Sequence, residues 1–200
     1  MFFRLIDVKE GEEYKMDNSE SNYSRFLNGD DEGLTLIIKD YKDGLILYLN
    51  SFVNNIYLAE DLMQETFFKI AVKKPKFKGK SSFKTWLYTI GRNLAIDHLR
   101  HNSRVSAFSI DSMKNSIEDE ANLEKLYIKN ERKIVVHKAL TTLKPEYRQV
   151  LWLIYFECFS NEEAAQVMNK SKRQIENLLF RAKQSLKATL DKGGLEYEEL

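Results

Sequence analysis

The sequence holds little of what marks secreted or fibrous proteins. Its 200 residues include one cysteine, two prolines and eight glycines. A single cysteine excludes an intramolecular disulfide framework and a cysteine-rich zinc site, so a reducing compartment is expected. The low glycine and proline content favours long uninterrupted helices and excludes collagen-like and low-complexity chains. We expect Cys158, inside the apolar stretch 150–159, to be a core residue.

Long hydrophobic runs are also missing. Arg4 and Asp7 interrupt the N-terminus before the apolar segment of a signal peptide is complete. The longest apolar run, 150–156, is far shorter than the roughly 20 residues that a membrane helix needs. We therefore expect a cytoplasmic protein with no membrane insertion.

The formal net charge of +1 hides segments of opposite character. From Lys69 to Arg104 there are ten Lys and Arg residues against one acid, Asp97. Such a local excess suits a surface that binds a polyanion, although a solvated basic face is the alternative. The compensating acids lie near the N-terminus and in residues 111–124, where helical periodicity lapses.

These patterns predict an all-α protein made of two small helical domains joined by a flexible linker. The expected segments are an N-terminal arm at 1–23, a first domain at 24–104, a linker at 105–128, a second domain at 129–192 and a C-terminal tail at 193–200.

The segment 58–72 reads as an amphipathic helix at about 100° per residue. One side collects the residues expected in the core: Leu62, Met63, Thr66, Phe67 and Ile70. The opposite side carries Asp61, Gln64, Glu65 and Phe68. An aromatic ring within an acidic exposed face suits an anchor that docks on a basic protein partner. The alternative is that another helix of the same domain covers Phe68.

Pro75 and Gly79 end this helix, and Ser82 or Ser81 is expected to cap the next one. One face of the new helix is expected in the core: Phe83, Leu87, Ile90 and Leu94. A second face carries Trp86, Thr89, Asn93 and Arg100. A stacking ring, an amide and a guanidinium on one side of a helix suit the bases and backbone of a nucleic acid. A Trp86 ring packed between helices is the rival interpretation.

No pattern indicates a metal, a cofactor or a catalytic centre. His98 and His101 lie beside Asp97 at ligand-like spacing, but no further histidine or cysteine is near in sequence, so we expect no metal site. Glycine-rich phosphate loops and nucleophile elbows are absent from the sequence, and an enzyme is therefore not expected.

The second domain shows clear helix boundaries. Pro145 fits a first helical position, and a strongly apolar helix is expected over 146–159. Residues 160–163 have the spacing of a capping box and open a short helix that ends at Met168. Asn169 suits a left-handed turn residue, and Ser171 suits the next N-cap. A helix, a tight turn and a capped helix form a helix-turn-helix layout.

The capped helix, 172–190, divides into two sides. The side expected to face the core of the domain holds Ile175, Leu178, Leu179, Ala182 and Leu186. The outer arc holds Arg173, Gln174, Asn177, Arg181 and Gln184, with Phe180 among them. Such side chains bond base edges and phosphates in a major groove, although surface helices also carry them for solubility.

Taken together, these motifs resemble those of the extracytoplasmic-function (ECF) group of bacterial sigma-70 factors. Three blocks occur in the family's order: 59–67 resembles the polymerase-binding helix of region 2, 83–100 resembles the part that melts and reads the −10 element, and 143–190 resembles region 4, which reads the −35 element. Together they span most of residues 24–190. The resemblance implies a dissociable promoter-specificity subunit with no catalysis of its own.

The resemblance also implies partners for each candidate face. The expected partners are core RNA polymerase, through its β′ clamp helices and β flap, and promoter DNA, with an anti-sigma factor as a further candidate. Asp61, Gln64, Glu65 and Phe68 would bind the polymerase. The −10 residues would be Trp86, Thr89, Asn93 and Arg100. The −35 residues would be Arg173, Gln174, Asn177 and Arg181.

The sequence departs from the family at four positions of the second domain. The family usually has a basic residue near Glu176, often Arg at Leu178, an apolar residue at Lys170 and Gly at Asn169. Because Glu176 repels phosphate, we expect a weaker or differently ordered −35 contact. The alternative function, a free-standing helix-turn-helix regulator, leaves the acidic face around Phe68 unexplained.

Overall fold

The computed structural model describes residues 18–106 and 139–192, and the chain divides into two compact units. We call residues 18–106 the N-terminal unit and residues 139–192 the C-terminal unit. Every regular element in these two ranges is a helix, as expected for an all-α protein. None of the helices in the described ranges is both long and apolar enough to cross a membrane.

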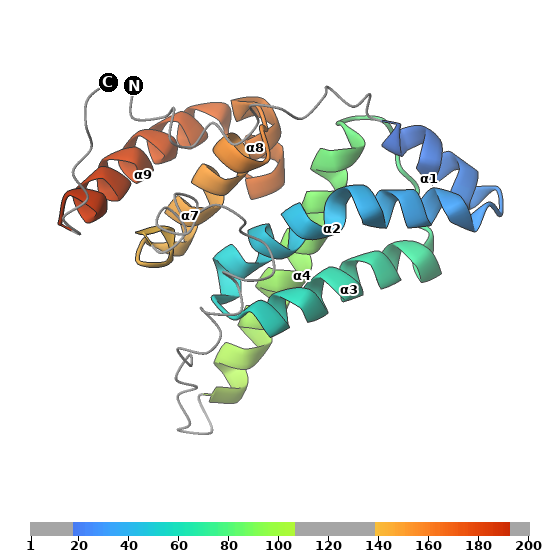
Figure 1. Cartoon of the computed structure of the whole chain (residues 1–200), viewed down its shortest axis with the longest axis horizontal. Coiled ribbons are helices and arrows are strands. Elements are labelled where there is room, and N and C mark those ends of the chain that lie inside the picture. Colours follow the sequence, from blue (N-terminus) through green and yellow to red (C-terminus); the bar gives the residue numbers. More distant parts are fainter. Residues whose placement is uncertain (1–17, 107–138, 193–200) are drawn as a thin grey trace. The chain divides into compact units, whose positions relative to one another are not determined.

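The N-terminal unit contains α1 (Ser19–Leu27), α2 (Asp31–Val53), α3 (Ile56–Lys73) and α4 (Phe83–Ser106). α2 packs along α3, α4 packs against both, and α1 lies on α2 (Figure 1). α1 begins at Ser19, inside the segment that the sequence analysis assigned to an N-terminal arm. This difference arises because the rings of Tyr23 and Phe26 are buried.

Short-range signals set the helix boundaries of this unit. The Asp30 carboxylate accepts a hydrogen bond from the Glu32 amide and caps α2. Asn54 ends α2 in the left-handed conformation, and the side chain of Asn55 then caps α3. Ser82 Oγ accepts a hydrogen bond from the Thr85 amide at 3.2 Å, so the expected cap of α4 is confirmed.

Close packing of α1 on α2 depends on a glycine. A Cβ atom at Gly33 would clash with the backbone oxygen of Asn22 and would lie 2.9 Å from the backbone nitrogen of Phe26. The helices can therefore approach closely only where the side chain is absent. Gly91 of α4 is also buried, but a Cβ there would meet only side-chain atoms, of Leu45, Thr66 and Leu49.

The core of the N-terminal unit includes a polar group without a partner. Tyr48 is fully buried, and its hydroxyl makes no hydrogen bond within the described structure. Burial raises the pKa of Tyr48 well above its ordinary value, and the positive charge of Arg92 opposes this only in part. The Tyr48 ring packs edge-on against Phe52 and in a tilted arrangement against Tyr88, so its aromatic face is well accommodated.

The C-terminal unit contains α7 (Pro145–Leu151), the π-helix η2 (Trp152–Phe156), α8 (Asn161–Met168) and α9 (Lys172–Lys192). Pro145 lies in the first turn of α7, as expected. Ser160 and Glu163 form the expected capping box, and Asn169 is left-handed with a φ of 53°. α9 packs against α7 and α8 (Figure 1), so the helix-turn-helix layout is present.

Two expectations for this unit were wrong. The apolar segment is not one helix over 146–159, because α7 passes into a π-helix that ends at Phe156. Cys158 is exposed rather than buried, and it adopts a left-handed φ of 54°. The buried position belongs instead to Phe159, whose amide donates a hydrogen bond to the Leu153 carbonyl at 2.9 Å.

Candidate polymerase and nucleic-acid interfaces

The buried face of α3 agrees with its sequence pattern. Leu62, Thr66, Phe67 and Ile70 are buried, and Met63 is half-buried. Thr66 satisfies its hydroxyl within the helix by donating to the Leu62 carbonyl at 2.7 Å. These buried residues fix which side of α3 faces the core, and the opposite side can therefore face a partner.

The exposed face of α3 forms a continuous stripe. Asp61, Gln64 and Glu65 are exposed, and Phe68 is 66% exposed, so no helix of the described unit covers its ring. Tyr57 and Val72, at 54% and 62% exposure, extend the stripe at both ends. We call these residues the α3 stripe. Tyr57 and Val72 were not predicted for this face, although they lie four residues before Asp61 and four after Phe68.

Trp86 of α4 packs against other parts of the unit, which supports one of the two interpretations that the sequence left open. Its ring is half-buried. One part packs in an aromatic cluster with Tyr23, Phe77 and Phe83, whose centroids lie 5.3 to 5.4 Å away. The cluster thus holds the Trp86 ring in a defined orientation.

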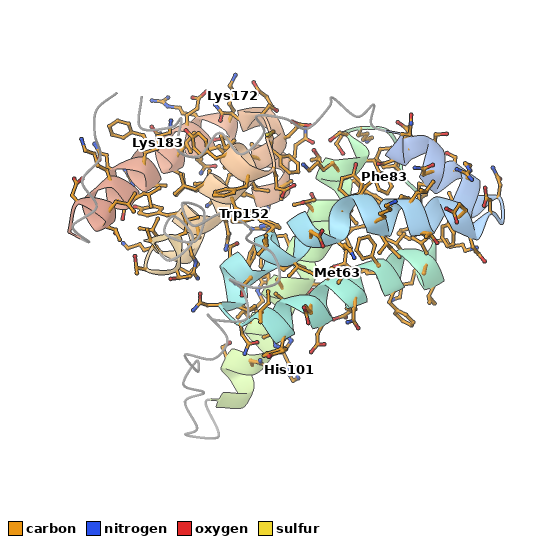
Figure 2. All side chains as sticks on the ribbon, in the orientation of Figure 1. Met63, Phe83, His101, Trp152, Lys172 and Lys183 are labelled. Carbon is orange, nitrogen blue, oxygen red and sulfur yellow. The ribbon has the colours of Figure 1, made fainter. Side chains whose placement is uncertain are left out.

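The other candidate residues of α4 continue along the same face. Thr89 is half-buried and donates its hydroxyl to the Thr85 carbonyl, while Asn93 and Arg100 are exposed. Arg100 lies 3.9 Å from Asp97, an exposed pair that leaves the guanidinium accessible. Figure 2 labels Phe83 at the beginning of this helix and His101 near its far end. Of the expected core face, Phe83 and Leu87 are buried, whereas Ile90 and Leu94 are half-buried.

A basic segment between α3 and α4 borders the aromatic cluster. Tyr23 donates its hydroxyl to the Pro75 carbonyl at 2.6 Å and anchors the segment. The Lys74 ammonium lies 4.7 Å from the centroid of the Phe26 ring. The segment also exposes Lys76, Lys78 and Lys80. The positive charge predicted from the sequence is therefore at the surface next to Trp86.

α9 presents the predicted polar arc. Ile175, Ala182 and Leu186 are buried, and Leu178 and Leu179 are half-buried. The arc itself is exposed: Arg173, Gln174, Asn177, Arg181 and Gln184. Phe180 is 62% exposed within this arc.

The start of α9 is fixed by two sets of polar contacts. The backbone amide of Gln174 donates a hydrogen bond to Ser171 Oγ at 3.2 Å, and the backbone amide of Ser171 donates one to Gln174 Oε1 at 2.7 Å. Lys172 pairs with Glu162 of α8 at 2.5 Å. This hydrogen bond lowers the pKa of Glu162 and raises that of Lys172. Figure 2 shows Lys172 where α9 begins and Lys183 further along the helix.

A buried arginine ties the first part of the C-terminal unit together. Arg148 of α7 donates from Nη1 to the Thr141 carbonyl at 2.8 Å. Burial lowers the pKa of its guanidinium, although an arginine stays charged. The contact fixes the segment before Pro145 on α7.

His98 of α4 has a local partner. His98 Nε2 lies 2.8 Å from the side-chain nitrogen of Asn102. No group of three His, Cys, Asp or Glu side chains within the described ranges is arranged to hold a metal.

Comparison with known protein families connects both units to transcription. The model of sigma-70 region 2 matches residues 37–105, and the model of sigma-70 region 4 matches residues 133–186. The ECF sigma factor SigM of Bacillus subtilis is 30% identical over 161 residues, covering 78% of this chain and 94% of SigM. The sigma-H factor of Pseudomonas aeruginosa is 28% identical over 174 residues, covering 83% of this chain and 90% of that factor.

Solved structures show the same fold. CnrH, in complex with the cytosolic domain of CnrY, has a TM-score of 0.65 at 21% identity and covers 88% of this chain and 99% of CnrH. The sigma factor RpoE of Bartonella quintana, in complex with the anti-sigma factor NepR, has a TM-score of 0.62 at 25% identity. The match covers 84% of this chain and 98% of RpoE.

The chain therefore belongs to the sigma-70 family, with region 2 in its N-terminal unit and region 4 in its C-terminal unit. Within that family it is of the ECF type, a non-enzymatic factor that directs the initiation of transcription. Sigma factors bind core RNA polymerase and promoter DNA, so the alternative of a free-standing regulator is set aside.

Proposed function

We propose that this sigma factor joins core polymerase to a promoter through three helix faces. The α3 stripe docks on the β′ clamp helices, the Trp86 face of α4 binds the −10 element, and the outer arc of α9 enters the −35 major groove. The C-terminal unit also contacts the β flap. The first promoter-binding domain includes α1, so it begins at Ser19 rather than at residue 24 and extends to residue 104. The linker 105–128 joins it to the second domain at residues 129–192.

The α3 stripe is the observation that carries the proposal. Phe68, at 66% exposure, lies beside the exposed carboxylates of Asp61 and Glu65. A large exposed ring surrounded by acids suits a partner that offers an apolar pocket with a basic rim. DNA is polyanionic and would be repelled by this face. The stripe therefore favours a protein partner, and the polymerase clamp is the partner we propose.

The Trp86 face of α4 is proposed to hold the melted −10 strand. Its ring is pre-oriented by the aromatic cluster, which lowers the entropic cost of stacking a base on it. Asn93 offers an amide for base edges, and Arg100 a guanidinium for phosphates. The neighbouring lysines add attraction for the DNA backbone.

The outer arc of α9 is proposed to read the −35 element. Its residues follow a capped turn and a short helix, which is the layout that places a recognition helix in the major groove. Asn177 and Gln174 present amides, and Arg173 and Arg181 present guanidinium groups. All four are exposed in the structure.

The test of this function is run-off transcription with core polymerase from the source organism. The template is a library of that organism's upstream regions, and a housekeeping sigma factor is the positive control. Transcripts that start at defined sites only when the protein is added are expected, and they also reveal its promoter. Absence of stimulation, while the control sigma factor is active, would contradict the proposal.

An anti-sigma factor is a further candidate partner. Because the related RpoE of Bartonella quintana is bound to an anti-sigma factor, we propose that such a partner also masks this chain. We propose a cytoplasmic location, where polymerase and DNA are found. Co-purification from the source organism under non-inducing conditions tests whether an anti-sigma factor binds this chain.

A further inference from the structure

α9 carries one acid in the part of the helix that faces the proposed groove. Its acidic residues are Glu176 and, near the far end, Asp191. Glu176 is the fifth residue of the helix and is exposed. It follows Arg173 by three positions and precedes Phe180 by four, so these side chains are neighbours on the surface of the helix. The first turns of a recognition helix are those that reach base edges.

Two lysines of α9, Lys172 and Lys183, have other partners. Lys172, one turn before Glu176, pairs directly with Glu162 of α8. Glu176 adds only a minor attraction to Lys172. The ammonium of Lys183 lies 5.3 Å from the centroid of the Tyr155 ring. The negative charge of Glu176 is thus available for a ligand.

A carboxylate in a major groove has few favourable partners. It only accepts hydrogen bonds, and phosphates repel it. Guanine presents acceptors to the groove, thymine an acceptor and a methyl group, and adenine an acceptor beside its amino group. Cytosine presents an amino donor alone, and this donor suits Glu and Asp side chains.

We propose that Glu176 is a specificity-determining residue that selects cytosine at one position of the −35 element. Its carboxylate accepts a hydrogen bond from the cytosine N4 amino group, while Arg173 and Arg181 supply the attraction to the DNA backbone. This inference rests on the proposed docking of α9 in the −35 groove. It differs from simple phosphate repulsion, because repulsion would weaken binding to every sequence alike.

The test is competitive transcription by the holoenzyme on one of its mapped promoters, randomised at the −35 element. Glu176→Gln keeps the shape of the side chain and removes its charge. Asp191→Asn is the matched control, because it removes the same charge from the same helix about 22 Å further along. Polymerase capture measures holoenzyme formation by each variant.

The expected result is a preference of the unaltered protein for cytosine at one −35 position. Glu176→Gln reduces this preference by about 5- to 100-fold, and Asp191→Asn retains it. If Glu176→Gln kept the same base preferences, the inference would be overturned, whether overall transcription rose uniformly or stayed the same. The docking of α9 in the −35 groove would still stand. If the unaltered protein transcribed with no preference at any −35 position, the docking itself would be wrong.

Discussion

Ser171 and Gln174 cap the start of α9 reciprocally. The backbone amide of Gln174 donates to the Ser171 side chain at 3.2 Å, and the backbone amide of Ser171 donates to the Gln174 side chain at 2.7 Å. Gln174 closes the cap with its side-chain oxygen, and we expect its side-chain nitrogen to contact DNA. The stability of α9 and the proposed reading of DNA are coupled at this residue.

Two substitutions separate these roles. Ser171→Ala removes the cap and is expected to destabilise the start of α9 by about 1 kcal/mol, with little effect on the groups that face DNA. Gln174→Glu keeps an acceptor for the Ser171 amide but adds negative charge to the proposed DNA face. Hydrogen exchange of α9 peptides should accelerate only in Ser171→Ala, and transcription should fall more in Gln174→Glu. If transcription fell in Ser171→Ala but not in Gln174→Glu, which keeps the cap, Gln174 would act through the cap alone.

The α3 stripe predicts a polymerase-binding hot spot. Phe68→Ala should weaken binding to core polymerase by about 30-fold, because a central aromatic anchor is worth about 2 kcal/mol. Leu27→Ala is the matched control, since Leu27 is also an exposed apolar residue of the N-terminal unit but lies on α1. Affinity is measured by titration of labelled protein with core polymerase. Equal losses in both variants would exclude a specific role for Phe68.

Gly33 predicts a steric limit between α1 and α2. Gly33→Ala should destabilise the packing of α1 by about 1 to 3 kcal/mol, because the new methyl group meets the backbone of α1, which cannot rotate away. Gly91→Ala should be close to neutral, since the side chains around it can shift and alanine favours a helix by about 1 kcal/mol. Hydrogen exchange of α1 peptides compares the two, and a larger effect at Gly91 would contradict this account.

Trp86, a half-buried residue on the proposed −10 face of α4, is expected to stack on a −10 base. Trp86→Ala should reduce the affinity of the holoenzyme for a single-stranded −10 oligonucleotide by about 5- to 100-fold. Phe83→Leu disturbs the same aromatic cluster from a fully buried position and is the control for lost packing. If Phe83→Leu lowered the affinity as much as Trp86→Ala, the ring would be acting through the core and not by contact with DNA.

Local chemistry explains which features could be predicted from the sequence. Ser82, Ser160 and Ser171 cap helices as expected, and Asn169 makes the left-handed turn, because each of these signals acts over three or four residues. The two faces of α3 and α9 follow from helical periodicity in the same way. Roles on the polymerase and on DNA stay predictions, since they depend on partners.

Only the tertiary structure decided the features that depend on distant residues. Trp86 became half-buried because α1 and the segment before α4 bring Tyr23 and Phe77 against it. Cys158 became exposed because the π-helix ends the apolar segment at Phe156 and the chain turns before α8. Helical periodicity carries no information on which distant side chains pack against a helix, or on whether an apolar segment continues as one helix. The sequence alone thus determined the faces of α3, α4 and α9 and the family, whereas long-range packing decided that α1 belongs to the first domain and which side chains remain at the surface.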